Sequence, residues 1–184
     1  MRLTLTIAML AALAAGCAGS QTKPSQAKEG AKEGESKSSL ISDLQGARLS
    51  ASTLSARKLM YKKVEGILAK GQPAKYKAYY NGEVLRIVQE ESDLGDYGES
   101  EKEYFLDAEG RLFYYVASDE RAKQAAKQKV KTRVAYDASG RVVGSEKIVN
   151  GQPAKLPDAE IKAIKARLDL LRKAAAASRK PKSS

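Results

Sequence analysis

Residues 130–143 read VKTRVAYDASGRVV, and this stretch indicates how the chain folds. Over residues 130–136, residues suited to a buried face alternate with exposed ones such as Lys131 and Arg133. A period of two residues is typical of a strand with one face in the core. In residues 137–140, Asp opens a type I turn and Gly accepts the positive φ that closes it. The stretch therefore predicts a β-hairpin.

Two further hairpins precede this one. Residues 107–110 have the same Asp and Gly positions, and Asn81-Gly82 is a strong signal for a two-residue hairpin loop. The glycines of the three turns are 28 and 30 residues apart. Three hairpins in succession predict an antiparallel meander of six strands. Residues 119–128, between the second and third hairpins, are expected to form a short polar helix or a loop.

Helical patterns flank the meander on both sides. Residues 50–70 are expected to form a helix that Ser52 or Thr53 caps and Gly71 ends. Residues 157–177 are expected to form a second helix, because apolar residues recur there at helical spacing. Its apolar stripe consists of Ile161, Ile164, Leu168 and Leu171. The fold class is therefore α+β, with an N-terminal helix, the meander and a C-terminal amphipathic helix packed on one face.

The composition of the chain predicts its domain boundaries. Residues 18–46 are rich in Lys, Glu, Ser, Gly and Gln and cannot bury a core, so 17–46 is expected to be a disordered linker. A single domain is expected over 47–178, followed by a basic tail at 179–184. The formal net charge of the whole chain is +11, which favours anionic partners.

The first 17 residues have the features of a cleaved leader. Arg2 is followed by an apolar run over 3–16, which is too short to cross a bilayer as a helix of about 20 residues. The run ends in Leu13-Ala14-Ala15-Gly16-Cys17, which resembles the lipobox of bacterial lipoproteins. The resemblance implies cleavage between Gly16 and Cys17 and a diacylglycerol on the Cys17 thiol. It also implies export, and Ala18 after the cysteine is similar to the pattern for an outer membrane, with the domain facing the periplasm.

The sequence offers little for catalysis. It contains no His and only one Cys, which removes the commonest general base, the commonest metal ligand and any Cys-cluster zinc site. No spacing selects a nucleophile and its base, and no Gly-rich phosphate loop is present. We therefore expect a protein that is not an enzyme and has no cofactor or metal. A hydrolase whose polar residues converge only in the fold is a third alternative.

Residues 90–103 carry seven acidic residues and one Lys, and are expected to form an acidic surface loop. Asp93, Asp96 and Glu99 offer oxygen ligands for Ca²⁺. Their spacing does not match that of an EF-hand loop, so a solvated loop facing a basic body is the favoured interpretation.

The tyrosines provide the candidate binding surface. Tyr79-Tyr80 and Tyr114-Tyr115 are consecutive in expected strands, so the two rings of each pair point to opposite faces of the sheet. One ring of each pair is therefore expected on the face away from the core. The alternative is that helices cover both faces. With Arg111 and Arg141, these tyrosines form the predicted surface for an envelope protein partner. The leading function is thus a lipid-anchored, non-catalytic protein-interaction module. The alternative is a binder or carrier of an anionic lipid, lipopolysaccharide or glycan on the basic sheet surface; export argues against nucleic acid.

Overall fold

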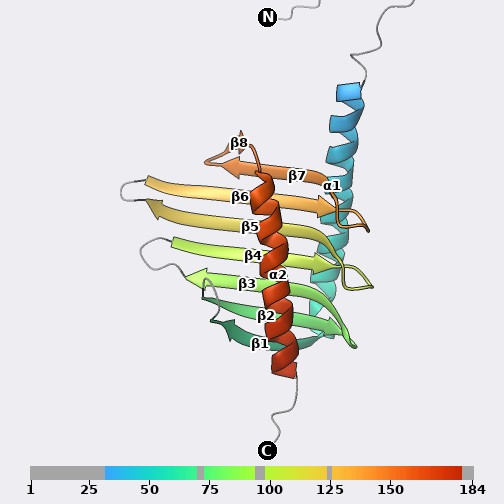
Figure 1. Ribbon diagram of the computed structural model, residues 1–184, viewed down its shortest axis with the longest axis vertical. Coiled ribbons are helices and arrows are strands. Elements are labelled where there is room, and N and C mark those ends of the chain that lie inside the picture. The colour runs from blue at the N-terminus through green and yellow to red at the C-terminus, as the bar shows by residue number, and fades with distance from the viewer. Residues whose placement is uncertain (1–31, 70–72, 94–97, 124–125, 180–184) are drawn as a thin grey trace, which may run out of the picture.

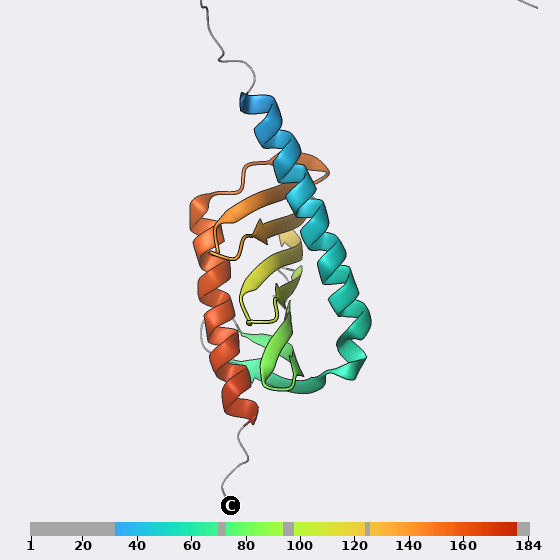
Figure 2. The same cartoon turned by 90° about the vertical axis from the view of Figure 1, so that its right-hand side faces the viewer.

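The computed structural model describes residues 32–69, 73–93, 98–123 and 126–179. Eight antiparallel strands form one sheet in which each strand lies beside its neighbours in the sequence, from β1 at one edge to β8 at the other. Figures 1 and 2 show one helix across each face of the sheet, with both helix axes running across the strands. The α+β class is therefore confirmed, but as a three-layer arrangement with eight strands instead of six.

The strands are β1 (Lys62–Leu68), β2 (Ala74–Asn81), β3 (Val84–Asp93), β4 (Gly98–Leu106), β5 (Leu112–Lys123), β6 (Ala126–Tyr136), β7 (Val142–Val149) and β8 (Gln152–Ala154). The helices are α1 (Lys32–Arg57) and α2 (Asp158–Arg179), and a short 3-10 helix, η1 (Lys58–Met60), joins α1 to β1.

The three predicted hairpins are present as β2–β3, β4–β5 and β6–β7. The loop of the first is Gly82-Glu83 and not Asn81-Gly82, because Asn81 ends β2 and pairs with Val84. Gly110 and Gly140 have φ angles of 78° and 79°, as closing residues of their turns. The Asp107 and Asp137 carboxylates accept hydrogen bonds from backbone amides within their own turns. Each hairpin also has a register shift just before its turn, so the three hairpins share one design.

Helix α2 confirms the predicted C-terminal helix and packs on one face of the sheet. Its buried side chains are Ile164, Leu168, Leu171 and Ala175. They contact a cluster that includes Tyr76, Tyr80, Tyr104, Tyr115 and Tyr136 from the strands. This cluster is the main core of the protein.

Three cations at seven-residue intervals connect α2 to the three hairpin turns. Lys165 Nζ donates to the carbonyl of Gly140 at 2.6 Å, and an Arg172 guanidinium nitrogen donates to the carbonyl of Gly110 at 2.6 Å. Arg179 pairs with Glu83, in the first turn, at 2.8 Å. Seven helical residues advance about 10.5 Å and two strands span about 9.6 Å, so a helix perpendicular to the strands meets one hairpin per heptad.

Helix α1 covers the other face and corrects the N-terminal prediction. It begins at Lys32 and ends at Arg57, so residues 32–46 are helical, where a disordered linker was expected. Thr53 does not cap the helix; its hydroxyl donates to the carbonyl of Leu49 one turn earlier. Among the side chains of α1 that the structure describes, Ala51 and Leu54 are the buried contacts with the sheet. Residues 17–31 and 180–184 lie outside the described residues.

The two extra strands arise where a helix and a connection were expected. Within residues 50–70, Lys62–Leu68 is strand β1, because Val64, Gly66 and Leu68 alternate with outward-facing residues. A Cβ at Gly66 would clash with the buried ring of Tyr76, so a larger residue there would require that ring to shift. The described residues of 119–128 extend β5 and β6 and are neither helix nor loop. Strand β8 adds three residues at the far edge.

Candidate functional site

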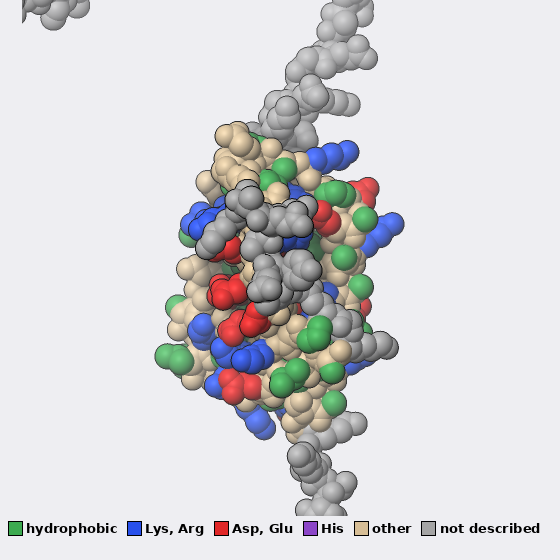
Figure 3. Space-filling model, turned by 90° about the vertical axis from the view of Figure 1, so that its left-hand side faces the viewer, with side chains coloured by type: hydrophobic (Ala, Val, Ile, Leu, Met, Phe, Trp, Pro, Cys, Tyr) green, Lys and Arg blue, Asp and Glu red, His purple; other side chains and the backbone are tan. Residues whose placement is uncertain are grey.

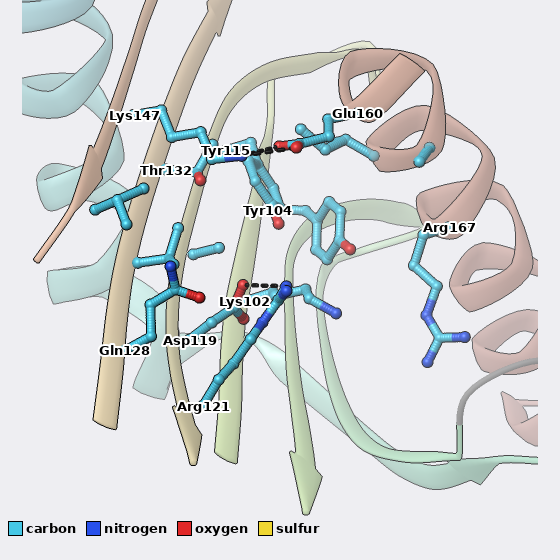
Figure 4. A pocket seen from close by; sticks show the side chains of 15 residues that line it. Lys102, Tyr104, Tyr115, Asp119, Arg121, Gln128, Thr132, Lys147, Glu160 and Arg167 are labelled. Carbon is cyan, nitrogen blue, oxygen red and sulfur yellow. Dashed lines mark hydrogen bonds and ion pairs between the residues drawn. The ribbon is translucent and has the colours of Figure 1, made fainter. Parts of the chain in front are cut away.

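A cleft of about 540 Å³ lies between the N-terminal half of α2 and the exposed part of the sheet. Figure 4 shows its floor of strand side chains and its wall of helix side chains. Lys102, Tyr104, Tyr115, Ala117, Asp119, Arg121, Gln128, Val130, Thr132, Lys147 and Val149 come from the strands, and Glu160, Ala163, Ile164 and Arg167 from α2. The cleft exists because the strands extend beyond the strip that α2 covers.

Strand register explains why these residues meet. Lys102 on β4 pairs with Ala117 on β5, which pairs with Thr132 on β6, which pairs with Lys147 on β7. Paired residues project from the same face, so this row lies side by side on the floor of the cleft. The small Ala117 in the middle leaves space between the two lysines.

A buried carboxylate lies behind the cleft floor. Glu90 on β3 has no exposed side-chain surface and receives hydrogen bonds from three side chains. Arg167 donates through two nitrogens, at 2.9 and 3.1 Å, to one carboxylate oxygen, which Lys102 approaches to 3.3 Å. The Tyr104 hydroxyl donates to the other oxygen at 3.1 Å. Glu90 therefore fixes two cations that line the cleft while remaining inaccessible itself.

Two further ion pairs lie at the margins of the cleft. Lys147 Nζ contacts both carboxylate oxygens of Glu160, at 2.6 and 2.8 Å, and so joins β7 to α2. Asp119 accepts from the Ser100 hydroxyl at 2.5 Å and pairs with Arg121 at 3.4 Å. In Figure 4 the labelled charged side chains surround the two tyrosine rings. The cleft thus contains cations whose positions are fixed by carboxylates.

The two tyrosines of the floor are held in their neutral form. Burial, reinforced by the negative charge of Glu90, raises the pKa of Tyr104 far above its usual value. Burial, with Asp119 as the next contribution, raises the pKa of Tyr115 in the same way. Their ring centroids are 5.1 Å apart at an angle of 54°. Both side chains are almost fully buried, so they form the base of the cleft, expose little ring surface and are poor proton acceptors near neutral pH.

The structure does not provide the predicted tyrosine surface. Tyr80 and Tyr115 lie beneath α2, Tyr79 and Tyr114 belong to the cluster beneath α1, and all four are buried. This corrects the prediction, because helices cover both faces of the sheet. Of these four tyrosines, only Tyr115 lines the cleft.

Arg111 and Arg141 lie apart from the tyrosines, in the hairpin turns. Each pairs with the aspartate of its own turn, Asp107 at 2.7 Å and Asp137 at 2.9 Å. Neither lines the cleft. Their role in the structure is to stabilise the turns.

The expected acidic loop is largely strand. Its described residues, 90–93 and 98–103, belong to β3 and β4, and Asp96 lies outside the described residues. Figure 3 shows this end of the molecule, where carboxylates gather with basic side chains around them. Among the described residues, no group of three His, Cys, Asp or Glu side chains is placed to hold a metal ion.

Sequence reasoning missed the central residues of the cleft. Glu90 follows the buried Val88 by two residues and precedes the buried Ser92 by two, so the strand period gave a signal for its burial. No comparable signal connects it to Arg167, which is 77 residues away and is brought close only by the packing of α2.

Within the described ranges, no helix is long and apolar enough to cross a membrane. Cys17 and the cleavage position after Gly16 lie outside these ranges, so the anchor stays a prediction. Comparisons with protein-family models, with characterised proteins and with solved structures found no match for this chain.

Proposed function

We propose that this protein is a lipid-anchored, non-catalytic protein of the cell envelope that binds a small anionic, hydroxyl-rich ligand in the cleft. An acidic sugar, a phosphorylated sugar or the polar head group of a lipopolysaccharide has this chemistry. The observation that carries the proposal is the convergence of Lys102, Arg121, Lys147 and Arg167 around Tyr104 and Tyr115. Cations attract the anionic group, and the polar side chains of Gln128 and Thr132 in the lining can hydrogen-bond to ligand hydroxyls.

The position of the cations favours a polar ligand over an acyl chain. The apolar side chains of the α2 face form one cluster packed against the helix. The cleft beside this cluster contains Gln128, Thr132 and charged groups as well as apolar side chains. Burying an acyl chain there would desolvate charges without compensation. Hydroxyl and phosphate oxygens would instead accept hydrogen bonds from the cations.

The same geometry supports a binding role over catalysis. Glu90, the most deeply buried carboxylate, is enclosed and receives three donors. Asp119 and Glu160 are each engaged by a cation. We therefore place these carboxylates as groups that orient the cations.

Titration calorimetry tests the cleft. The probes are oligogalacturonate, glucose 1-phosphate and vesicles of phosphatidylglycerol, each at low and high salt. Arg121 is exposed and lines the cleft, so Arg121→Gln should weaken binding of the sugar probes about tenfold without unfolding the protein. Arg141→Gln is the matched control, because Arg141 is a similarly exposed cation in a turn outside the cleft. Equal effects of the two variants would show general charge attraction and reject the cleft. Binding to vesicles alone would favour a lipid surface.

The anchor has its own test. Cys17→Ser removes the only thiol in the chain, so the protein should move from the membrane fraction to the soluble fraction. Quantitative retention in membranes after this change would contradict the lipid anchor. Binding to an envelope protein, the function first expected, stays a prediction, and the buried tyrosines no longer supply its surface.

A further inference from the structure

Strand β1 forms an exposed edge of the sheet with apolar side chains around it. In Figure 1 it is the lowest strand, and among the described residues no strand pairs with its outer side. Ile67 on β1 is 72% exposed, and Leu59 and Met60, just before the strand, are 93% and 84% exposed. Tyr61 is already extended, with φ −96° and ψ 148°, so the strand conformation reaches one residue further than β1 itself. Unpaired backbone groups beside apolar side chains favour pairing with another strand.

We propose that the β1 edge pairs with the β1 edge of a second copy of this chain, antiparallel and centred on Val64. A two-fold axis through Val64 places Lys63 opposite Glu65 of the second copy. The same axis places Ile67 opposite Tyr61 of that copy. By symmetry each contact occurs twice, and the two sheets join into one.

Charge selects this register over its neighbours. A strand can shift only in steps that keep side chains on the same face, so the alternatives are centred on Lys63 or on Glu65. Centring on Lys63 brings two lysines face to face, and centring on Glu65 brings two glutamates face to face. Like charges directly opposite destabilise a pair of strands, whereas opposite charges stabilise it. Only the register centred on Val64 pairs opposite charges.

The exposure of Ile67 is explained by the same register. Ile67, on the α1 face, lies opposite Tyr61, which contacts the smaller core cluster within its own chain. Pairing would therefore cover Ile67 with a side chain that already borders the core.

Lys63 does not protect this edge in the way that lysines on edge strands often do. Lys63 forms an ion pair with Glu65 in its own strand at 2.8 Å, so its charge is already balanced. In the dimer, Glu65 of the second copy would lie opposite the same lysine. The opposite edge differs, because β8 has three residues and includes Pro153, which donates no backbone hydrogen bond. Of the two sheet edges that the described strands form, only β1 is long and has exposed apolar side chains, so the pairing closes as a dimer.

Single-cysteine variants measure the register directly. In the full chain with Cys17→Ser, no other thiol remains. Opposed Cα atoms across the axis are about 4.5–5.5 Å apart, which a disulfide spans. Under mild oxidation in detergent, Val64→Cys should therefore give a covalent dimer. Lys63→Cys and Glu65→Cys are matched controls, because each would lie roughly 8 Å from its own copy in this register. They should cross-link at least tenfold more slowly.

Charge reversal provides a second measurement. In the Val64→Cys background, Glu65→Lys should reduce the cross-linking rate about tenfold, because two attractive pairs become repulsive. Adding Lys63→Glu should restore it, because the pairs are then reversed but attractive. Faster cross-linking of either control, no dimer from Val64→Cys in a protein with unchanged circular dichroism, or no rescue by the double reversal would each overturn the proposal. None of these outcomes depends on the ligand proposed for the cleft.

Discussion

The two faces of the sheet are each covered by a helix, but they are stabilised differently. On the α2 face, four buried helix residues contact a continuous cluster of strand tyrosines and aliphatic side chains. On the α1 face, Ala51 and Leu54 are the buried helix residues in a smaller cluster, and Leu49 is 70% exposed. Beyond α1 this face carries cross-strand ion pairs such as Lys77–Glu91 and Arg133–Glu146. The α2 face is thus held by the larger apolar cluster, and the α1 face by a smaller apolar cluster with more exposed ion pairs beside it.

The difference shows how a helix can be placed by two kinds of interaction. The apolar stripe of α2 determines which side of the helix faces the sheet, and its three heptad-spaced cations determine its position along the sheet. The described side chains of α1 show no equivalent set of contacts with the turns. We therefore expect α2 to be the more stable layer.

The largest effect should come from the two helix cores. Leu171→Ala removes a side chain with no exposed surface, which should lower the free energy of unfolding by about 4 kcal/mol. Leu54→Ala, the matched change on α1, should cost about 2 kcal/mol, because its smaller cluster lies nearer solvent and relaxes more easily. Urea unfolding followed by circular dichroism measures both. Equal losses would contradict the difference between the faces.

The same contrast explains what could be predicted about the fold. The C-terminal helix was predictable because Ile161, Ile164 and Leu168 repeat at helical spacing. The hairpins were predictable because their turns require Asp, Asn and Gly at fixed positions. Helix α1 has few apolar residues and contains Gly46, so its stability comes from contacts that composition does not reveal. Strand β1 was missed because its short apolar pattern also fits a helix.

Ion pairs on the two faces should differ in the same direction. Arg167→Leu leaves the buried Glu90 with Lys102 and Tyr104 alone, which should cost about 2–3 kcal/mol. Arg133→Leu, at the matched pair on the α1 face, should cost under about 1 kcal/mol, because both partners there are about one-third exposed. Urea midpoints for the two variants measure this difference. A larger loss for Arg133→Leu would reverse the ranking of the faces.

The candidate site could not be predicted for a related reason. Its floor depends on strand register, which places Lys102, Ala117 and Thr132 in one row. Its wall depends on how α2 crosses the sheet. Local sequence determines the strands and the helix separately. The contact between Glu90 and Arg167 forms only when α2 packs on the sheet. The prediction of a tyrosine surface was wrong for the same reason. The sequence did not indicate that α1 covers the second face of the sheet.

A smaller effect is expected from single hydroxyl groups. Tyr104→Phe removes one donor from the buried Glu90 and should cost about 1.5 kcal/mol. Tyr79→Phe, on the α1 face, removes a partly buried hydrogen bond to Gln89 and should cost about 0.5 kcal/mol. Thermal unfolding of both variants at neutral pH measures the difference. If Tyr104→Phe were neutral, the hydroxyl would not contribute to holding Glu90.

The smallest effect concerns the turn that Lys165 joins to α2, and it depends on pH. Hydrogen bonds from the Ser139 hydroxyl and from the amide of Arg141 lower the pKa of Asp137 well below its usual range. A carboxyl whose pKa is lower in the folded state stabilises the protein above its unfolded pKa of about 4. That contribution is lost as the pH falls through the lower folded value.

Asp137→Asn keeps an oxygen acceptor in the turn but cannot ionise. The melting temperature of the unchanged protein should therefore exceed that of the variant at pH 6, and the difference should shrink steadily below pH 4. Asp137 is a surface residue, so we expect this difference to be smaller than those of the buried groups. Glu109→Gln, at an exposed acid of the neighbouring turn, is the matched control for the loss of one surface charge. A difference that grew on acidification would mean that the turn is held without the charge of Asp137, and that Lys165 meets a turn whose shape the backbone alone determines.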